Sequence, residues 1–564
     1  MDTTPKADGL DPNRRKILKG GAVAGAATAA YGWLSPGTGT AQTTSPVPDP
    51  TPWLEPFLDP LTIPPVKTPT LLYPRPGALP VTGEAGREPH QRWTEFLPQR
   101  EYDLKARAFQ YRYHMHLPLE TVWGYDERIP GPTFVGRVGQ PALVRIRNEL
   151  PQEHVGYGSP EICTHLHGGH VGPASDGFAD NYFSPTKAGA GLRNPGAFYD
   201  HHYPHYPSDG DLRNVTNTLW YHDHREDFTA PNVYRGLAGF YLLFDSLDSG
   251  SEYTGLRLPS GVGRYDVPLV LQDKKFDSGG NLVFNQFDSE GFVGNHFLVN
   301  GKVQPYFKVE GRKYRFRLLN GSLARYFEMV LADENNRLQN FTFIASDGNL
   351  LERPLTLQKI LMGMAERADI IVDFSRYAPG TRLYLVNRLE QLDPRKPTGK
   401  LLYPGIRMLR FEVGPRTPDN SVIPAYLRPL APFDRNAVKI TRTFRFERNN
   451  SQWSINGKFW NPERVDAAPR MNVPEIWKLE AESGGWAHPI HVHLDDFRIL
   501  SINGKAPPPE WRGRKDTISL LPGDKAEILV EFRDFTGKYM MHCHQQAHED
   551  HAMMIRFDVV PGNT

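Results

Sequence analysis

From about Arg100 to the C-terminus, apolar residues recur in short alternating runs that are separated by turns rich in glycine and proline. Runs of this kind predict β-strands of a few residues, and many short strands between regular turns are typical of β-sandwich domains. Residues 142–147 (ALVRIR) and 527–532 (EILVEF) are clear strand candidates. The pattern therefore predicts an all-β protein.

Breaks in this pattern divide the chain into segments. A polar stretch rich in glycine and serine near residues 246–263 and a proline-spaced stretch near 414–434 separate three candidate sandwich domains. These domains span residues 81–248, 262–414 and 435–564. Residues 42–80 carry too many prolines for a helix or a central strand, so we expect an extended arm that lies along a domain surface.

Residues 1–41 have the features of an export signal. Arg14 and Arg15 precede a small, apolar run from Gly20 to Ala30, and small residues up to Ala41 offer a cleavage site. The arrangement resembles a twin-arginine signal, so we expect the twin-arginine export machinery as a partner and a periplasmic or secreted protein. A transmembrane anchor is the alternative, but the run is too short to span a bilayer comfortably. No other segment resembles a membrane span.

Composition narrows the function further. The 564 residues include 65 Lys and Arg against 64 Asp and Glu, so no charge excess favours nucleic acid or an anionic membrane as a partner. The chain has two cysteines, Cys163 and Cys543. If one of them binds a metal, no intrachain disulfide can form, and stability must come from a large core.

Residues 542–544 read His-Cys-His in a strand-like setting, after Gly537 and the run KYMM. Successive side chains of a strand point to opposite faces. His542 and His544 would therefore share one face, while Cys543 points to the other. One short strand could thus contribute to two metal sites that are joined by a few covalent bonds, an arrangement suited to moving electrons between them.

Further histidines occur in motifs of the same spacing. The motifs HLH, WYHDH, HPIHVH and HCHQQAHEDHAMM contain the pairs His165 and His167, His222 and His224, His491 and His493, and His542 and His544. The first two pairs lie in the first predicted domain and the others in the third. Each pair would present two imidazoles on one strand face. Imidazole suits copper, zinc, iron or nickel, so these pairs alone do not select the metal.

The cysteine thiolate does select the metal. Cys543, His548 and His488, with a weakly bound Met553, form the two-histidine, one-cysteine set with an axial methionine that is characteristic of blue copper. Zinc is the alternative, although structural zinc sites generally recruit more thiolates. The other eight histidines are then free for an all-imidazole centre, and eight ligands suit three copper ions with open positions for oxygen.

Together these motifs resemble the four copper signatures of the multicopper oxidases. Residues 312–320 (RKYRFRLLN) and 365–374 (AERADIIVDF) resemble the middle domain of that family. The branch that the chain resembles most contains spore-coat laccases, bilirubin oxidases and phenoxazinone synthases, as the segment LEPFLDPLTIPPV and the HED after the cysteine loop indicate. The resemblance implies three consecutive cupredoxin-like Greek-key domains.

The resemblance also implies four copper ions and a role for each ligand. His488, Cys543, His548 and axial Met553 would hold a type 1 copper. His165 and His491 would hold a type 2 copper. The type 3 pair would be held by His167, His222, His224, His493, His542 and His544. The trinuclear centre would lie between the first and third domains, with the middle domain largely a spacer and wall.

The implied function is that of a laccase-like oxidase. A phenol or aromatic amine would give single electrons to type 1 copper through the edge of His488, in a loop near the surface. Dioxygen would be reduced to two waters at the trinuclear centre, and protons would need carriers there. Glu549 and Asp176 match acidic positions used for proton delivery in this branch, while surface or capping carboxylates are the simpler interpretation.

Alternative functions use the same fold. A metal oxidase acting on Cu(I) or Mn(II) would share the copper core; the 11 methionines are scattered, which weakens the Cu(I) form. Exported division scaffolds with this fold lack copper ligands, whereas all ten histidines and Cys543 are present here. A copper nitrite reductase would lack the type 3 set, and a small electron-transfer cupredoxin would need only the type 1 set. The physiological reductant cannot be read from these motifs.

Overall fold

Strands form where the chain alternates between apolar and polar residues. In the computed structural model, which describes residues 52–154 and 156–562, strand β1 (Arg100–Tyr111) buries Tyr102, Leu104 and Ala106 on one face. Strand β4 (Ala142–Asn148), one of the two candidates from the sequence, is almost entirely buried because it lies between β1 and β6 (Phe198–Tyr203). The second candidate is β30 (Lys525–Val530).

Three pairs of sheets follow one another along the chain, and we call them the first, second and third sheet pairs. The first pair comprises the sheet β2-β1-β4-β6 and the sheet β3-β8-β7-β5. Its other strands are β2 (Glu120–Tyr125), β3 (Gly131–Arg137), β5 (Thr164–His167), β7 (Thr218–Asp223) and β8 (Ala238–Phe244).

The second sheet pair contains a sheet of order β11-β10-β9-β13-β19-β16-β17 and a sheet of order β12-β21-β20-β14-β15, with β18 on β14. The strands of the first of these sheets are β9 (Asp266–Lys274), β10 (His296–Val299), β11 (Lys302–Val303), β13 (Lys313–Asn320), β16 (Phe341–Ser346), β17 (Asn349–Leu357) and β19 (Arg367–Asp373). The strands of the second are β12 (Tyr306–Gly311), β14 (Phe327–Asp333), β15 (Leu338–Gln339), β18 (Lys359–Met362), β20 (Arg382–Leu389) and β21 (Leu401–Arg416).

The third sheet pair has the orders β23-β22-β25-β30-β27-β28 and β24-β32-β31-β26-β29. The first of these sheets contains β22 (Ile440–Asn449), β23 (Gln452–Ile455), β25 (Glu475–Ala481), β27 (Phe497–Ile502) and β28 (Arg514–Lys515). The other contains β24 (Val465–Ala467), β26 (His488–Val492), β29 (Thr517–Leu520), β31 (Gly537–Cys543) and β32 (Met554–Val559). The predicted all-β fold is confirmed.

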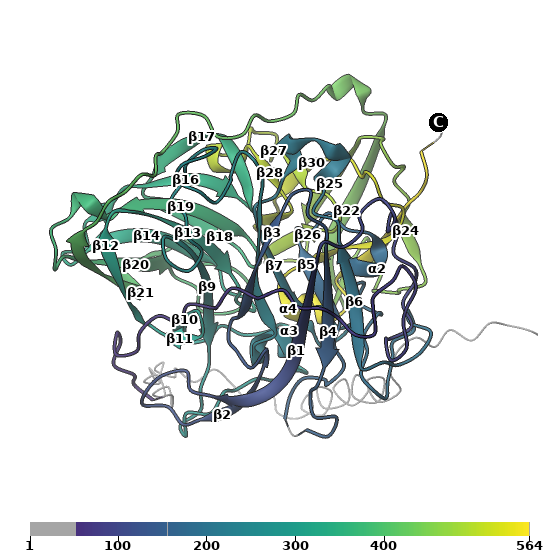
Figure 1. Cartoon of the computed structure of the whole chain (residues 1–564), viewed down its shortest axis with the longest axis horizontal. Helices are drawn as coiled ribbons and strands as arrows, with labels where there is room; N and C mark the ends of the chain where they lie inside the picture. Colours follow the sequence, from purple (N-terminus) through teal and green to yellow (C-terminus); the bar gives the residue numbers. More distant parts are fainter. Residues whose placement is uncertain (1–51, 155, 563–564) are drawn as a thin grey trace, which may run out of the picture. The chain divides into compact units, whose positions relative to one another are not determined.

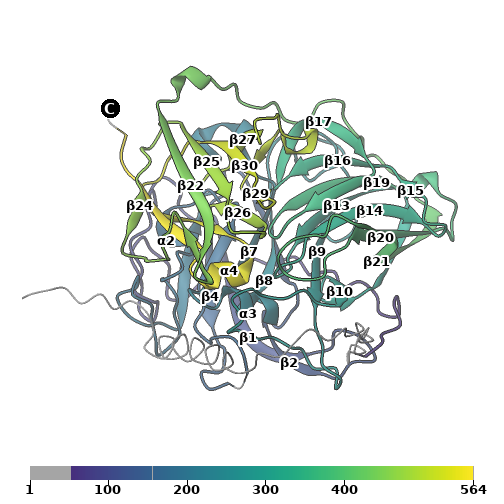
Figure 2. The same ribbon diagram turned by 180° about the vertical axis from the view of Figure 1, so that it is seen from behind.

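Helices are short and lie between strands. They are α2 (Pro173–Asp176), α3 (Thr229–Arg235) and α4 (Gln546–Asp550), with 3-10 turns η1 (Ser208–Gly210), η2 (Leu212–Asn214), η3 (Phe374–Arg376), η4 (Arg435–Ala437) and η5 (Pro509–Trp511). Helices α3 and α4, which are far apart in the sequence, lie side by side (Figures 1 and 2). Within the described residues, no helix is long and apolar enough to cross a membrane.

The described part of the proline-rich arm joins the first two sheet pairs. The Leu61 N–H donates to the Tyr306 carbonyl (2.8 Å), and the Lys67 N–H donates to the Thr133 carbonyl (2.8 Å). The predicted export signal, residues 1–41, and the start of the arm lie outside the described residues. The strands of the three sheet pairs span residues 100–244, 266–416 and 440–559, and the limits of the three domains stay a prediction.

Candidate metal centres

Strand β31 carries His542 and Cys543 to opposite sides of its sheet. It pairs antiparallel with β26, with His491 opposite His542 and Ile490 opposite Cys543. Cys543 is part of the apolar core of the third sheet pair. His542 instead faces histidines of the first sheet pair, and its Nε2 lies 3.2 Å from that of His224. The alternation along one strand thus separates two groups of metal-ligand side chains.

The first group, which we call the cysteine site, consists of His488, Cys543, His548 and Met553. The Cys543 Sγ lies 3.4 Å from His488 Nδ1 and 3.6 Å from His548 Nδ1. These three ligand atoms lie within 4.8 Å of one another, and all four side chains are fully buried. The Met553 backbone closes the loop, because its N–H donates to the His548 carbonyl and its carbonyl accepts from the Cys543 N–H.

Aromatic and hydroxyl groups cover the two imidazoles of the cysteine site. The Trp453 ring lies 3.7 Å from the His548 ring, centroid to centroid. The His488 Nε2 lies 2.5 Å from the Ser483 hydroxyl oxygen. His488 itself is 0% exposed, and the loop before it, which contains Ser483, includes the exposed residues Glu482 and Gly484. Electron entry through the edge of His488 stays a prediction.

The second group, which we call the histidine site, contains eight imidazoles from four strands or their ends. Strand β5 pairs with β7, which places His165 opposite His222. Strands β26 and β31 supply the imidazoles of the third sheet pair, and β5 and β7 lie close to β26 in Figure 1. Three groups of ligand atoms consist of imidazoles alone: His165, His167 and His491; His167, His222 and His544; and His224, His493 and His542; a fourth group joins Asp176 to His165 and His493.

Burial favours the uncharged form of several of these imidazoles, which is the form that binds metals. Burial, reinforced in most cases by neighbouring imidazoles, lowers the pKa of His165, His167 and His491 well below the ordinary value. The pKa of His224 falls to about 4, chiefly through burial. Metal binding needs neutral imidazole, so no proton has to be displaced from these rings at neutral pH.

Each of several rings has one nitrogen held by an oxygen and the other left without a partner. The Nδ1 atoms of His222 and His491 lie 2.8 Å from the carbonyl oxygens of Asp223 and Asp516. The Nε2 atoms of both rings, and that of His165, have no hydrogen-bond partner although they are buried. Leaving a buried nitrogen without a hydrogen-bond partner costs free energy, and a metal ion bound to the nitrogen would remove that cost. The donor set therefore fits bound cations.

The cysteine site fits a cation as well. Burial raises the pKa of the Cys543 thiol well above its ordinary value, so the free side chain is uncharged. A bound cation favours the thiolate, and two imidazoles and a thiolate, with Met553 as the predicted axial ligand, suit copper best. The His548 Nε2 is buried without a hydrogen-bond partner.

Two carboxylates border the histidine site from opposite sides. The Asp176 Oδ2, at the end of α2, lies 2.8 Å from His493 Nδ1, while its Oδ1 has no hydrogen-bond partner. In α4, Glu549 has one oxygen 3.2 Å from His542 Nδ1 and the other 3.5 Å from His224 Nε2. Burial raises the pKa of Asp176, whereas for Glu549 the effect of burial is outweighed by His542 and His224, which lower it.

A third carboxylate was not identified from the sequence. The Asp516 Oδ1 lies 3.0 Å from His167 Nε2, and Asp516 forms a buried ion pair with Arg367 of β19, whose Nη1 donates to Oδ1 at 2.7 Å. Arg367 lies in the AERADIIVDF segment, but a lone Asp in RKDT has no recognisable signal. The second sheet pair is thus more than a spacer, because Arg367 holds a residue that contacts a candidate ligand.

Other histidines and the second cysteine lie apart from these groups. The Cys163 Sγ–H donates to the Phe178 carbonyl (3.3 Å). The imidazole of His170 lies between Asp495 and Asp534, 3.0 Å from each. Among the described residues, none of the groups of potential metal ligands includes Cys163, His114, His116, His170, His201, His202, His205 or His551.

Comparison with known proteins agrees with this geometry. A family model described as multicopper oxidase matches residues 433–563, and a second model of the same description matches residues 271–400. The chain is 35% identical over 527 residues to a bilirubin oxidase of Albifimbria verrucaria, covering 89% of this chain and 81% of that one. It is 31% identical over 510 residues to a laccase of Bacillus subtilis, covering 81% and 94%. A crystal structure of a multi-copper oxidase from Pediococcus acidilactici aligns with a TM-score of 0.71 at 26% identity, covering 90% and 94%.

Proposed function

The chain belongs to the multicopper oxidase family, and we propose that it oxidises phenols or aromatic amines while reducing dioxygen to water. It is a laccase-like, copper-dependent oxidoreductase that uses oxygen, with cupredoxin-like sheets. The proposed step beyond this is the class of reducing substrate. The observation that carries the oxidase function is that two different metal-ligand sites are joined through adjacent residues of one strand.

The proposed assignment uses four copper ions. His488, Cys543 and His548, with Met553, would hold the type 1 ion. The three histidine groups would hold the others: His165 and His491 the type 2 ion, His167, His222 and His544 one type 3 ion, and His224, His493 and His542 the second. Bound copper supplies one-electron redox chemistry at the cysteine site and reduction of dioxygen at the histidine site.

The chain's own residues provide the connection between the sites. Cys543 is bonded through its backbone to both His542 and His544, which belong to different groups of three at the histidine site. Electrons therefore have two short covalent routes from the thiolate to the imidazoles. Full burial of these side chains excludes water along both routes.

Protons reach the histidine site through carboxylates in this proposal. Glu549 places its oxygens beside His542 and His224, and both oxygens are buried without a protein hydrogen-bond partner. Asp176 orients His493 through one oxygen and leaves the other unpartnered. A carboxylate in this position can hold a proton next to the point where oxygen is reduced.

The small reductant would act at the cysteine site. Because Ser483 covers His488, an outer-sphere donor needs only to approach this loop and have a suitable potential. Phenols and aromatic amines meet that requirement, and no described feature requires a metal ion as the donor. Oxidation of Cu(I) or Mn(II) is the alternative function, and the following experiment distinguishes it from oxidation of phenols or amines.

The experiment is oxygen uptake by copper-loaded protein with a phenol, an aromatic amine, bilirubin, Cu(I) and Mn(II) as separate reductants. We expect blue absorption and oxygen uptake with the phenol or the amine. A clear preference for Cu(I) or Mn(II) would replace the proposed substrate class. Absence of both the blue colour and oxygen uptake with every reductant would contradict the oxidase function and favour a scaffold.

We also propose that the protein is exported by the twin-arginine machinery to the periplasm or beyond. The support is the sequence of residues 1–41, with Arg14 and Arg15 before a short apolar run. Replacing both arginines by lysine should retain the protein in the cytoplasm, as measured by cell fractionation. Unchanged export of this variant would contradict the proposal.

A further inference from the structure

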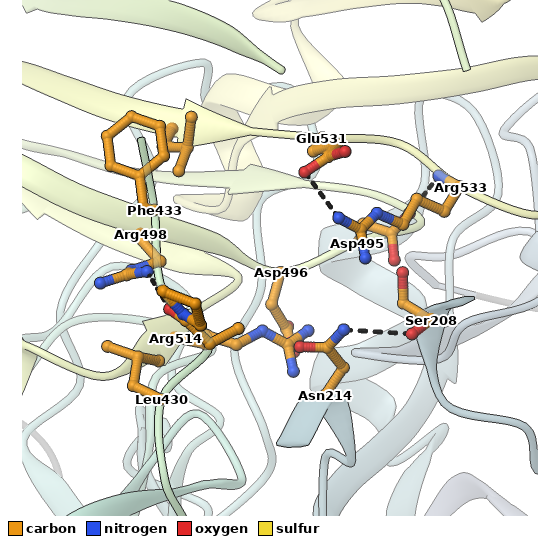
Figure 3. A pocket seen from close by; sticks show the side chains of 13 residues that line it. Ser208, Asn214, Leu430, Phe433, Asp495, Asp496, Arg498, Arg514, Glu531 and Arg533 are labelled. Carbon is orange, nitrogen blue, oxygen red and sulfur yellow. Dashed lines mark hydrogen bonds and ion pairs between the residues drawn. The ribbon is translucent and has the colours of Figure 1, made fainter. Parts of the chain in front are cut away.

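A small polar pocket lies where the first and third sheet pairs meet (Figure 3). Its volume is about 100 Å³, which corresponds to roughly three water molecules at ~30 Å³ each. The turns η1 and η2, residues 430–433, and the strands β27, β28 and β30 with the residues after it provide the walls. None of its lining residues belongs to the cysteine site or the histidine site.

Two arginines from neighbouring strands line this pocket. Arg498 of β27 and Arg514 of β28 are directly opposite in an antiparallel pair, so their side chains share a face. Of the two, only Arg514 forms an ion pair among the described residues, with Asp496. The pKa of Arg498 is lowered, chiefly by burial; Glu352 opposes this shift and Arg514 adds to it.

The acidic residues of the pocket already have partners. The Asp496 Oδ2 accepts from Arg514 Nη2 (2.9 Å) and from the Thr216 hydroxyl (2.7 Å). Glu531 pairs with Arg533 at 2.7 Å. The Asp495 Oδ2 accepts from the Arg533 backbone N–H (2.9 Å), and its Oδ1 lies 3.0 Å from His170 Nδ1.

Arg498 is the cation that remains without a carboxylate. Its Nη1 donates to the Ala431 carbonyl (2.6 Å), and among the described residues it forms no ion pair. Arg514 is only 9% exposed, yet its Nη1 has no hydrogen-bond partner. A buried guanidinium nitrogen without an acceptor is costly, so the pocket lacks an acceptor at this point.

We propose that this pocket binds a tetrahedral oxyanion of the phosphate or sulfate class between Arg498 and Arg514. Guanidinium groups donate to such oxygens through two N–H groups at once. Ser208 and Asn214 line the same pocket from the first sheet pair, so polar residues reach it from more than one element. Donors from several directions suit a tetrahedral anion better than a flat carboxylate.

Binding here would strengthen the junction of the first and third sheet pairs. Arg498 and Arg514 come from the third pair, whereas Ser208 and Asn214 come from the first. The Asp496 carboxylate, which Arg514 holds, lies three residues after the candidate ligand His493. An oxyanion would therefore stabilise the folded protein with or without copper, by the ordinary linkage of ligand binding to folding.

The test is calorimetric titration of the metal-free full chain with inorganic phosphate, compared with chloride and acetate at equal ionic strength. We expect saturable binding of one phosphate per chain, a higher thermal unfolding midpoint in phosphate, and weaker binding of acetate. Arg498→Gln should weaken phosphate affinity by about tenfold or more, since a charged hydrogen-bond donor is lost. Arg376→Gln, which alters an exposed arginine of the second sheet pair, should change nothing.

Phosphate that binds no better than chloride would overturn the proposal, and so would equal binding of acetate or an Arg498→Gln affinity like that of Arg376→Gln. If Arg498→Gln does not fold, a crystal soaked in selenate decides the question: an anomalous selenium peak between Arg498 and Arg514 supports the site, and its absence overturns it. The readout is binding and not turnover, so either result leaves the copper chemistry untouched.

Discussion

The cysteine site and the histidine site are built in different ways. The cysteine site takes all its residues from the third sheet pair and is enclosed by that pair's apolar core. The histidine site takes four imidazoles from the first sheet pair and four from the third, and carboxylates orient several of them. One sandwich can therefore form the first site, whereas the second exists only when two sandwiches are held in register. Substitutions can therefore impair one site while leaving the other intact.

The largest effect is expected for Cys543→Ser. Serine removes the thiolate on which the cysteine site depends but keeps the strand and its neighbours. Blue absorption and oxidase turnover should both fall to background, while the histidine site keeps its copper and the thermal unfolding midpoint changes little. Absorption spectra, oxygen uptake and copper content measure this. Residual turnover at a substantial rate would show that electrons reach the histidine site without Cys543.

Glu549→Gln should impair the histidine site alone. Loss of a positioned proton carrier typically costs about 10²-fold or more in rate. Oxygen reduction, measured by stopped-flow reoxidation of the reduced enzyme, should slow by about that factor, and the blue absorption should remain. The matched control is Asp550→Asn, the neighbouring carboxylate of α4, which accepts from two backbone N–H groups at the start of α3. A normal rate of reoxidation in Glu549→Gln would show that Glu549 does not carry protons to the histidine site.

Arg367→Met tests whether the second sheet pair supports the histidine site. It leaves Asp516 as a buried carboxylate without its ion-pair partner, which typically costs about 3–5 kcal/mol. The free energy of unfolding in denaturant should fall by that amount, and copper should be lost from the histidine site before the cysteine site. Arg376→Met alters an exposed residue of the same sheet pair, and its free energy of unfolding should stay within about 0.5 kcal/mol of the wild-type value.

The contact between the first and third sheet pairs should depend on pH through His170. Burial alone would lower its pKa, but Asp495 and Asp534 raise it from 6.5 to about 9. A raised pKa means that the stabilisation is fully present below pH 6.5 and is lost as the pH rises through about 9. The free energy of unfolding of the wild type should thus exceed that of His170→Gln by about 3 kcal/mol at pH 6.

That difference should have disappeared by pH 10, as denaturant unfolding of both proteins at the two pH values can measure. A constant difference between pH 6 and pH 10 would show that His170 acts by packing and not by its charge.

The smallest effect is expected for Ser483→Ala at the cysteine site. The variant removes one hydrogen bond to His488, worth about 0.5–1.5 kcal/mol, and uncovers the outer edge of the ring. We expect a change in kcat/KM for phenols of between about two- and tenfold and a small shift in the potential of the blue centre. Reoxidation by oxygen should be unchanged. An altered reoxidation rate would mean that Ser483 influences both sites.

Much of the candidate site could be predicted from local sequence. Each His-x-His pair lies on a strand or at its end, and the alternation of strand side chains correctly separates Cys543 from His542 and His544. The spacing of His548 and Met553 after Cys543 also belongs to a short loop, which local chain geometry constrains. These features were readable because they depend on residues that are neighbours in the chain.

Other features could not be read because their partners are far apart. Asp516 meets Arg367 across 149 residues and His167 across 349. Trp453 covers His548 from a strand almost a hundred positions earlier.

The sequence by itself determined the fold class and predicted the candidate metal ligands, because strand periodicity and ligand chemistry are properties of short segments. The tertiary structure alone decided how the imidazoles divide into groups of three, which carboxylate orients which ring, and where Arg498 and Arg514 form a pocket. The physical reason is strand pairing and sheet packing: the register of β5 with β7 and of β26 with β31, and the contact between the two sheet pairs, bring distant side chains within bonding distance.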